Sequence, residues 1–96
     1  MNDDQRRLLW HFSQGGCIRR PRRDRLGQGS GRYKKGWEVR LLVYTAEELA
    51  EVRTLLARCG LRAGEPYAKG QRTVQPVYGE LAVACFDEWL RVTVGV

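Results

Sequence analysis

Five arginines fall within the seven residues RRPRRDR, residues 19–25, and they form the densest group of chemically active side chains in the sequence. A guanidinium group is a planar, permanently charged fork that can bind a phosphate through two parallel hydrogen bonds. We therefore predict that this run neutralises phosphates of a nucleic acid and that one or two of its side chains contact base edges. The alternative is a solvated edge strand whose charges discourage aggregation. The five residues are Arg19, Arg20, Arg22, Arg23 and Arg25.

Further cations extend the predicted nucleic-acid surface. A glycine-rich segment, residues 26–36, interleaves Tyr33 with cations, and its ring could stack on a base. An ordinary surface loop also carries lysines, so that alternative stays open. The further residues of the predicted binding set are Arg32, Lys34 and Lys35 in this segment, Arg40 in the next strand, and Lys69 and Arg72 at a later hairpin.

Charge is distributed unevenly along the chain. Residues 1–40 hold eleven Lys or Arg and four Asp or Glu, whereas residues 41–96 hold six and seven. A one-sided cationic field attracts a polyanion, and nucleic acid is the commonest polyanion in the cytosol. The predicted partner is nucleic acid, and an acidic protein is the alternative partner.

The cysteines and the histidine predict neither a metal site nor a cofactor site. Cys17, Cys59 and Cys85 are odd in number and widely spaced, with no CxxC pair, so neither a disulfide framework nor a zinc site follows. His11 is the only histidine, which excludes a multi-histidine metal site within one chain. A Cys/His catalytic pair is a weaker alternative to a histidine on a helix face. We expect no cofactor and no catalytic residue.

Length and composition indicate one globular domain without a membrane segment. The chain has 96 residues, of which 43% are hydrophobic and 29% charged, which is ordinary for a soluble protein. No stretch approaches the roughly 20 apolar residues of a spanning helix, and the start MNDDQRR lacks the apolar core of a signal peptide. We expect a cytoplasmic protein with no membrane partner.

The first elements are predicted from apolar spacing and glycines. Asp3 or Asp4 could cap a first helix that ends at the glycine pair 15–16, and Leu8, Leu9 and Phe12 would form its apolar face. Residues 17–23 then resemble an exposed strand or an extended arm, in which Pro21 marks an edge or a break. Residues 26–36 contain too many glycines for regular structure and are expected to form a flexible basic loop.

A strand and a helix follow with clear signals. Residues 37–44 alternate, so that Trp37, Val39, Leu41 and Val43 share the core face. Thr45 and Glu48 have the spacing of a capping box, and the helix that follows should end at the glycine at position 60. The acids of its first turns, Glu47, Glu48 and Glu51, resemble a metal site only superficially, because acids there favour the helix dipole.

The last third predicts a hairpin and a closing helix. Two extended runs flank Lys69-Gly70-Gln71, and residues 80–92 place Val83, Phe86 and Trp89 on one face. The resulting order is αββαββα, an α+β fold with one antiparallel four-stranded sheet and helices packed on one face. The other face would then stay exposed and carry several of the cations.

This order and two motifs resemble a single LAGLIDADG homing-endonuclease domain. The segment LLWHFSQGG, residues 8–16, lies where the nine-residue motif would be, and it matches at Leu8, the apolar Phe12 and the final Gly16. The segment VYGELAVACFDEWL, residues 77–90, resembles the strand-glycine-helix ending of that family. The resemblance implies one such domain over residues 1–92, with a C-terminal tail at residues 93–96, and a sheet that binds DNA.

Departures from the motif bear on activity. Trp10 stands where the family has its middle glycine, Ser13 replaces an aspartate, and Gly15 replaces the acid that would hold the divalent metal. Since a hard cation needs carboxylate oxygens, we expect a DNA-binding protein that has lost catalysis. One alternative is a homodimeric endonuclease that uses Mg²⁺ through a shifted ligand such as Asp24; another is a protein-interaction module with a basic docking arm.

Overall fold

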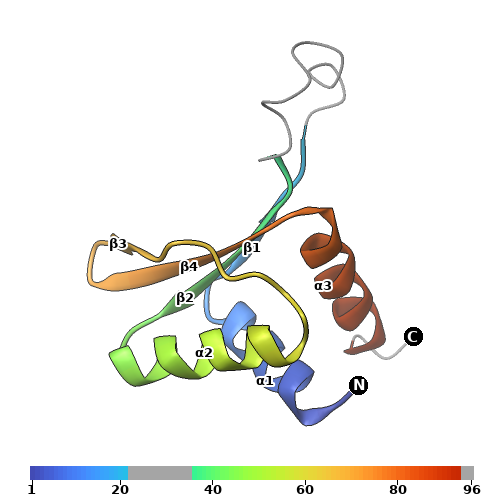
Figure 1. The fold of residues 1–96 in the computed structure, drawn as a ribbon, viewed down its shortest axis with the longest axis horizontal. Helices are drawn as coiled ribbons and strands as arrows, with labels where there is room; N and C mark the ends of the chain where they lie inside the picture. The colour runs from blue at the N-terminus through green and yellow to red at the C-terminus, as the bar shows by residue number, and fades with distance from the viewer. Residues whose placement is uncertain (22–35, 94–96) are drawn as a thin grey trace.

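The computed structural model describes residues 1–21 and 36–93 and has the predicted order of elements (Figure 1). The four strands form one antiparallel sheet in the order β1-β2-β4-β3. The α+β fold class, with three helices and one four-stranded sheet, is thus confirmed. The elements are α1 (Asp3–Ser13), β1 (Cys17–Arg19), β2 (Glu38–Val43), α2 (Ala46–Arg58), β3 (Tyr67–Lys69), β4 (Arg72–Tyr78) and α3 (Glu80–Thr93).

The three helices lie on one face of this sheet, as Figure 1 shows. Alternate residues of β2 point into the core, where Leu41 is fully buried. The helices supply the other half of the core with Leu8, Val52 and Phe86, which are also fully buried. Because side chains alternate along a strand, the intervening residues of β2 lie on the opposite face, which none of the three described helices covers.

The helix boundaries confirm some sequence signals and correct one. Thr45 and Glu48 form the predicted capping box of α2, and Gly60 follows that helix with a positive φ of 75°. The prediction that Asp3 or Asp4 caps α1 is wrong. Asn2 is the cap, because its side chain accepts from the backbone N–H of Gln5 at 2.8 Å while the Gln5 side chain accepts from the Asn2 N–H at 3.1 Å.

The first strand is shorter than predicted. It ends at Arg19, while residues 22 and 23 of the predicted strand lie outside the described residues. Pro21 follows two residues after the strand, where the missing N–H of proline costs no ladder hydrogen bond. A Cβ added at Gly36 would lie 2.7 Å from the Pro21 Cβ, so the chain returns to this point before β2. The predicted loop at residues 26–36 otherwise lies outside the described residues.

A proline within β4 is tolerated because the neighbouring strand is short. The turn at Gly70 has a positive φ of 63°, and β3 pairs only with residues 72–74 of β4. Beyond this point Gly64 donates to the Pro76 carbonyl at 2.8 Å, and the buried Gln75 side chain donates to the carbonyls of both residues. Its oxygen accepts from Arg53 of α2 at 2.9 Å. Side-chain hydrogen bonds thus complete this edge of the sheet.

Candidate nucleic-acid interface

The sheet face opposite the helices, which we call the open face, carries four of the predicted binding cations. The register pairs Arg40 with Pro76 and Leu42 with Val74, which fixes these residues on one side. The residues of the open face are Cys17 and Arg19 of β1, Glu38, Arg40 and Leu42 of β2 with Tyr44 directly after it, Tyr67 and Lys69 of β3, and Arg72, Val74, Pro76 and Tyr78 of β4.

Only part of the predicted binding set falls on described residues. Arg19, Arg40, Lys69 and Arg72 share the open face, whereas Arg20 lies on the other side and contacts α3. The sheet therefore brings together cations that are far apart in sequence. The remaining predicted residues, Arg22, Arg23, Arg25, Arg32, Lys34 and Lys35, lie outside the described part of the chain, as does Asp24.

Glu38, the acid on the open face, is buried between two arginines. The Glu38 side chain accepts a hydrogen bond from the Arg40 Nε at 3.0 Å, and the Arg19 Nη1 lies 3.9 Å from its other oxygen. The hydrogen bond to Glu38 raises the pKa of Arg40 above its ordinary value. Glu38 is only 4% exposed, because the long arginine side chains extend over it. The cluster of Arg19, Glu38 and Arg40 therefore exposes its guanidinium groups to solvent rather than its carboxylate.

Arg72 extends across the open face at its other end. Its guanidinium carbon lies 5.1 Å from the centre of the Tyr44 ring, which is within the range of a cation–π contact. A Cβ added at Gly15 would lie 3.1 Å from the Arg72 Nη1, so this side chain reaches the turn after α1. Leu42, Lys69 and Arg72 line a depression of about 270 Å³. Two cations border a depression with an apolar base.

Arg20 makes a two-pronged ion pair with Asp87 of α3. The two nitrogen–oxygen distances are 2.8 and 2.7 Å. The hydrogen bonds lower the pKa of Asp87 and raise that of Arg20. Both side chains remain about half exposed, so this arginine is engaged within the fold but accessible to solvent.

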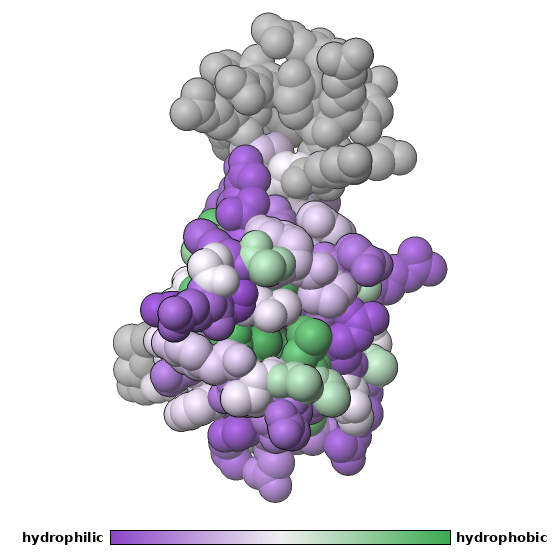
Figure 2. All heavy atoms as spheres, turned by 90° about the vertical axis from the view of Figure 1, so that its left-hand side faces the viewer, coloured by the Kyte–Doolittle hydropathy of each residue, from purple (hydrophilic) through white to green (hydrophobic). Residues whose placement is uncertain are grey.

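Three tyrosines on the open face were not predicted as site residues. Tyr44 is 57% exposed, Tyr67 42% and Tyr78 48%. The sequence carried a signal only for Tyr67, which alternates with Lys69 in a strand pattern. Strand pairing was needed to bring the three rings to one face. Figure 2, viewed from the side of the β3–β4 hairpin, shows a mainly hydrophilic surface with a small apolar area near its centre. Exposed aromatic rings beside cations are typical of protein surfaces that bind single-stranded nucleic acid.

The buried histidine belongs to a structural cluster on the helix side. His11 is 1% exposed, and its Nε2 lies 2.8 Å from the Glu51 carboxylate. Arg7 donates to both oxygens of the same carboxylate at 3.1 and 3.2 Å. These hydrogen bonds lower the pKa of Glu51. Across residues 1–21 and 36–93, no three His, Cys, Asp or Glu side chains are grouped to hold a metal ion.

The glycine at the acid position of the motif has a specific local role. Gly15 has a φ of +123°, and a Cβ there would lie 2.9 Å from the Leu42 side chain as well as against Arg72. A side chain at this position would strain the backbone, because L residues rarely adopt this φ. It would also require the ends of the Leu42 and Arg72 side chains to move.

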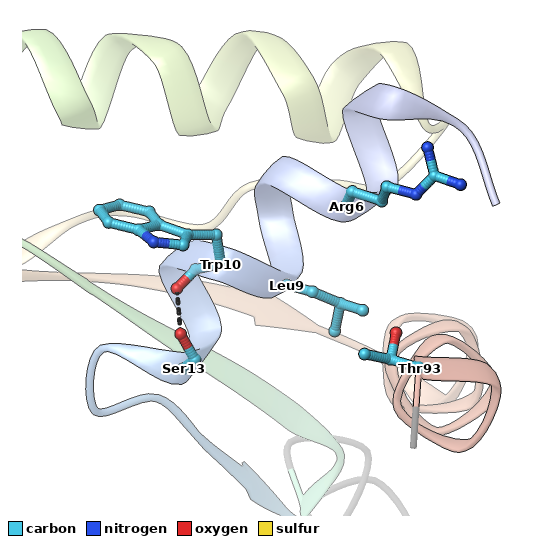
Figure 3. Close-up of a pocket in the computed structure, with 5 residues that line it drawn as sticks. All are labelled: Arg6, Leu9, Trp10, Ser13 and Thr93. Atoms are coloured by element: carbon cyan, nitrogen blue, oxygen red, sulfur yellow. Dashed lines mark hydrogen bonds between the residues drawn. The ribbon is translucent and has the colours of Figure 1, made fainter. Parts of the chain in front are cut away.

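Trp10 lies on the outer side of α1 and is 44% exposed. Its ring carries the Arg7 guanidinium at 4.5 Å from the centroid. Figure 3 shows Leu9 pointing toward Thr93 at the end of α3 while Trp10 points away from it. These residues help to line an apolar groove of about 280 Å³ between the two helices.

Comparison with protein-family models, with curated proteins and with solved structures finds no match to this chain. None of the helices in the described part of the chain is both long and apolar enough to cross a membrane. The function therefore has to be argued from the geometry of the open face.

Proposed function

We propose that this chain binds nucleic acid through the open face of its sheet and does not cleave it. The observation that carries the proposal is the gathering of Arg19, Arg40, Lys69 and Arg72 on a face that no helix covers. Within the described residues, the one acid on that face is Glu38, which lies beneath two of these arginines. The four cations outnumber this single acid, so the described part of the open face has a net positive charge.

Arginine and lysine would contribute differently to this binding. The guanidinium groups can bind phosphate oxygens in pairs, whereas Lys69 acts as a point charge at the hairpin tip. Such contacts release counterions, so affinity falls steeply with salt. The cations would contact phosphates of duplex and single strands alike, and duplex DNA, which the resemblance implies, is the first ligand to test.

The local geometry at Gly15 supports a non-cleaving role. The resemblance implies a metal-holding acid at this position, where the chain has a glycine with a φ of +123° that L side chains rarely adopt. The backbone conformation at the end of α1 thus disfavours any side chain there, a carboxylate included. Loss of that acid and gain of a cation over the site both favour binding without hydrolysis.

Fluorescence anisotropy with labelled duplex DNA, and with RNA in parallel, tests the proposal at several salt concentrations with and without Mg²⁺. We expect micromolar or tighter binding at low salt that weakens as salt rises and does not need Mg²⁺. The variant Lys69→Ala/Arg72→Ala should bind at least about 5-fold more weakly, with a salt slope lower by roughly 1 to 2. Its control is Arg58→Ala/Arg91→Ala, which removes equal charge from α2 and α3. Equal losses in both variants, or no binding at low salt, would contradict the proposal.

A docking surface for an acidic protein is the second candidate, because Trp10 borders an apolar groove beside two arginines, Arg6 and Arg7. An apolar anchor in a charged setting is typical of protein interfaces. Excess heparin separates the two functions: it should displace a nucleic acid held by phosphate contacts, whereas a shape-specific contact at Trp10 should persist. The variant Trp10→Ala should then affect only the protein contact.

A further inference from the structure

Two apolar side chains on the open face are buried although no helix or strand formed by residues 1–21 and 36–93 covers them. Val74 is 2% exposed and Pro76 is also buried. Val74 lies outside the hydrophobic cluster beneath the helices, which agrees with its place on the opposite face. Within the described residues, their neighbours are the longer side chains of the same face and the segment at Gly64, which donates to the Pro76 carbonyl.

The tyrosines provide this cover. Tyr67 is the cross-strand partner of Val74. A Cβ added at Gly64 would lie 2.5 Å from the Tyr78 ring and 3.2 Å from the Pro76 Cγ, so the Tyr78 ring lies across the edge of the sheet beside the proline. Each ring contacts the sheet on one side, yet more than two fifths of each side chain is exposed. The rings form a platform with an apolar base.

Cations surround this platform at neighbouring sheet positions. Arg40 pairs with Pro76, which lies two residues along β4 from Val74, the partner of Tyr67. Lys69 lies two residues from that tyrosine on the same strand face. Neighbouring positions on one sheet face are about 5 to 7 Å apart. The tyrosine rings and the cations that could bind phosphates therefore lie one or two side chains apart on this face.

A duplex would leave the platform unused. Its bases are stacked on one another, so it offers phosphates and groove edges, and its major groove admits a helix or a two-stranded ribbon rather than a four-stranded face. Exposed tyrosine rings gain little against a phosphate. Unpaired bases expose flat faces, and stacking one of them on an aromatic side chain contributes about 1–3 kcal/mol.

We infer that unpaired bases stack on Tyr67 and Tyr78, so that the preferred ligand of the open face is single-stranded nucleic acid. This inference rests on the proposed function, because the cations around the platform must bind the phosphates of the same strand. It departs from the expectation of duplex DNA, which came from the resemblance and not from the chemistry of this face.

The test compares one labelled oligonucleotide as a single strand and annealed to its complement, in DNA and RNA forms. We expect the single strand to bind at least about 10-fold more tightly. The variant Tyr67→Leu/Tyr78→Leu, which keeps an apolar cover over Val74 without flat rings, should lose at least about 5-fold in affinity for the single strand. It should leave duplex affinity unchanged. Tyr67→Phe/Tyr78→Phe keeps both rings and should retain the preference, and Trp10→Leu is the control for an exposed aromatic elsewhere.

The outcomes distinguish the two proposals. Binding to neither form sinks the proposed function and this inference together. Salt-dependent binding with equal or tighter affinity for the duplex overturns the inference and leaves the proposed function standing. An equal loss of affinity for the single strand and the duplex in Tyr67→Leu/Tyr78→Leu also overturns the inference, provided that circular dichroism and thermal unfolding show the variant to be folded.

Discussion

Neighbouring residues of one type have different roles in this protein, because side chains alternate along an extended chain. Arg19 lies on the open face while Arg20 points to the other side and binds Asp87. The sequence predicted both as binding residues, and residue type and spacing alone could not separate them. What decides is the partner element: Asp87 lies 67 residues away, and only the packing of α3 against the sheet brings it to Arg20.

Replacing these two arginines should give different results. Arg19→Ala should weaken nucleic-acid binding by about 2- to 10-fold, whereas Arg20→Ala should change it by less than about 2-fold. Arg20→Ala should instead lower the free energy of unfolding by about 0.2–1 kcal/mol, since its half-exposed ion pair is screened by water. Anisotropy titrations and urea unfolding of the two variants give both quantities. A larger binding loss for Arg20→Ala would mean that phosphate displaces Asp87.

Gly15 should be far less tolerant of substitution than a glycine that has only a positive φ. Gly15→Ala combines an unfavourable φ with contacts closer than 3 Å to Leu42, and we expect a loss of about 2–3 kcal/mol. Gly60→Ala is the matched control, because nothing lies within 4 Å of its added Cβ, and it should cost about 1 kcal/mol. Urea unfolding measures both. Equal losses would show that the close approach to Leu42 and Arg72 relaxes freely.

At the scale of elements, the sequence predicted those whose signals are local. The capping box of α2 and the turn at Gly70 depend on residues within a few positions, and both are present. The predicted cap of α1 was wrong, because Asn2 competes with the adjacent Asp3 and Asp4 for the cap position. The strand predicted from residue 17 ends at Arg19, two residues before Pro21. The register of the strands could not be predicted from the sequence, since it depends on which strands pair with one another.

The contact between α1 and α2 should make stability depend on pH. Hydrogen bonds from His11 and Arg7 hold the pKa of Glu51 below its ordinary value of 4.5, against the opposing effect of burial. A depressed carboxyl pKa stabilises the folded state above the unfolded-state value, and this contribution is lost as pH falls through the folded-state value. Glu51→Gln should therefore unfold more easily than the native chain near neutral pH.

We expect this difference to be about 1 kcal/mol near neutral pH, because the Glu51 side chain is 40% exposed and its ion pairs are partly screened. It should shrink as pH falls below about 4.5. Urea unfolding of both proteins across this range gives the difference directly. Glu47→Gln is the control, since it removes the same charge from the first turn of the same helix. A difference independent of pH would mean that Glu51 acts through packing alone.

For the whole molecule, the proposed nucleic-acid binding has two separate contributions: the uneven charge along the sequence and the cations of the open face. Residues 22–35 contain six Lys or Arg and one Asp, in a chain whose formal net charge is +6. The open face adds four cations from elements spread between residues 19 and 72. Composition could predict the first contribution, but the second depends on the fold, because β2 and β4 must pair to align Arg40 with the edge carrying Tyr67 and Tyr78.

Removing residues 22–35 should separate long-range attraction from recognition. Pro21 and Gly36 lie against each other, so an Asn-Gly turn can join them as a two-residue hairpin connection. We expect the shortened chain to fold, to bind single strands more weakly, and to lose up to about 4 from its salt slope, since each phosphate contact on a single strand contributes roughly 0.7. The ratio of single-strand to duplex affinity should stay within about 2-fold of that of the full chain, because stacking on the tyrosines does not depend on counterion release. If that ratio falls to one, residues 22–35 rather than the open face select the ligand.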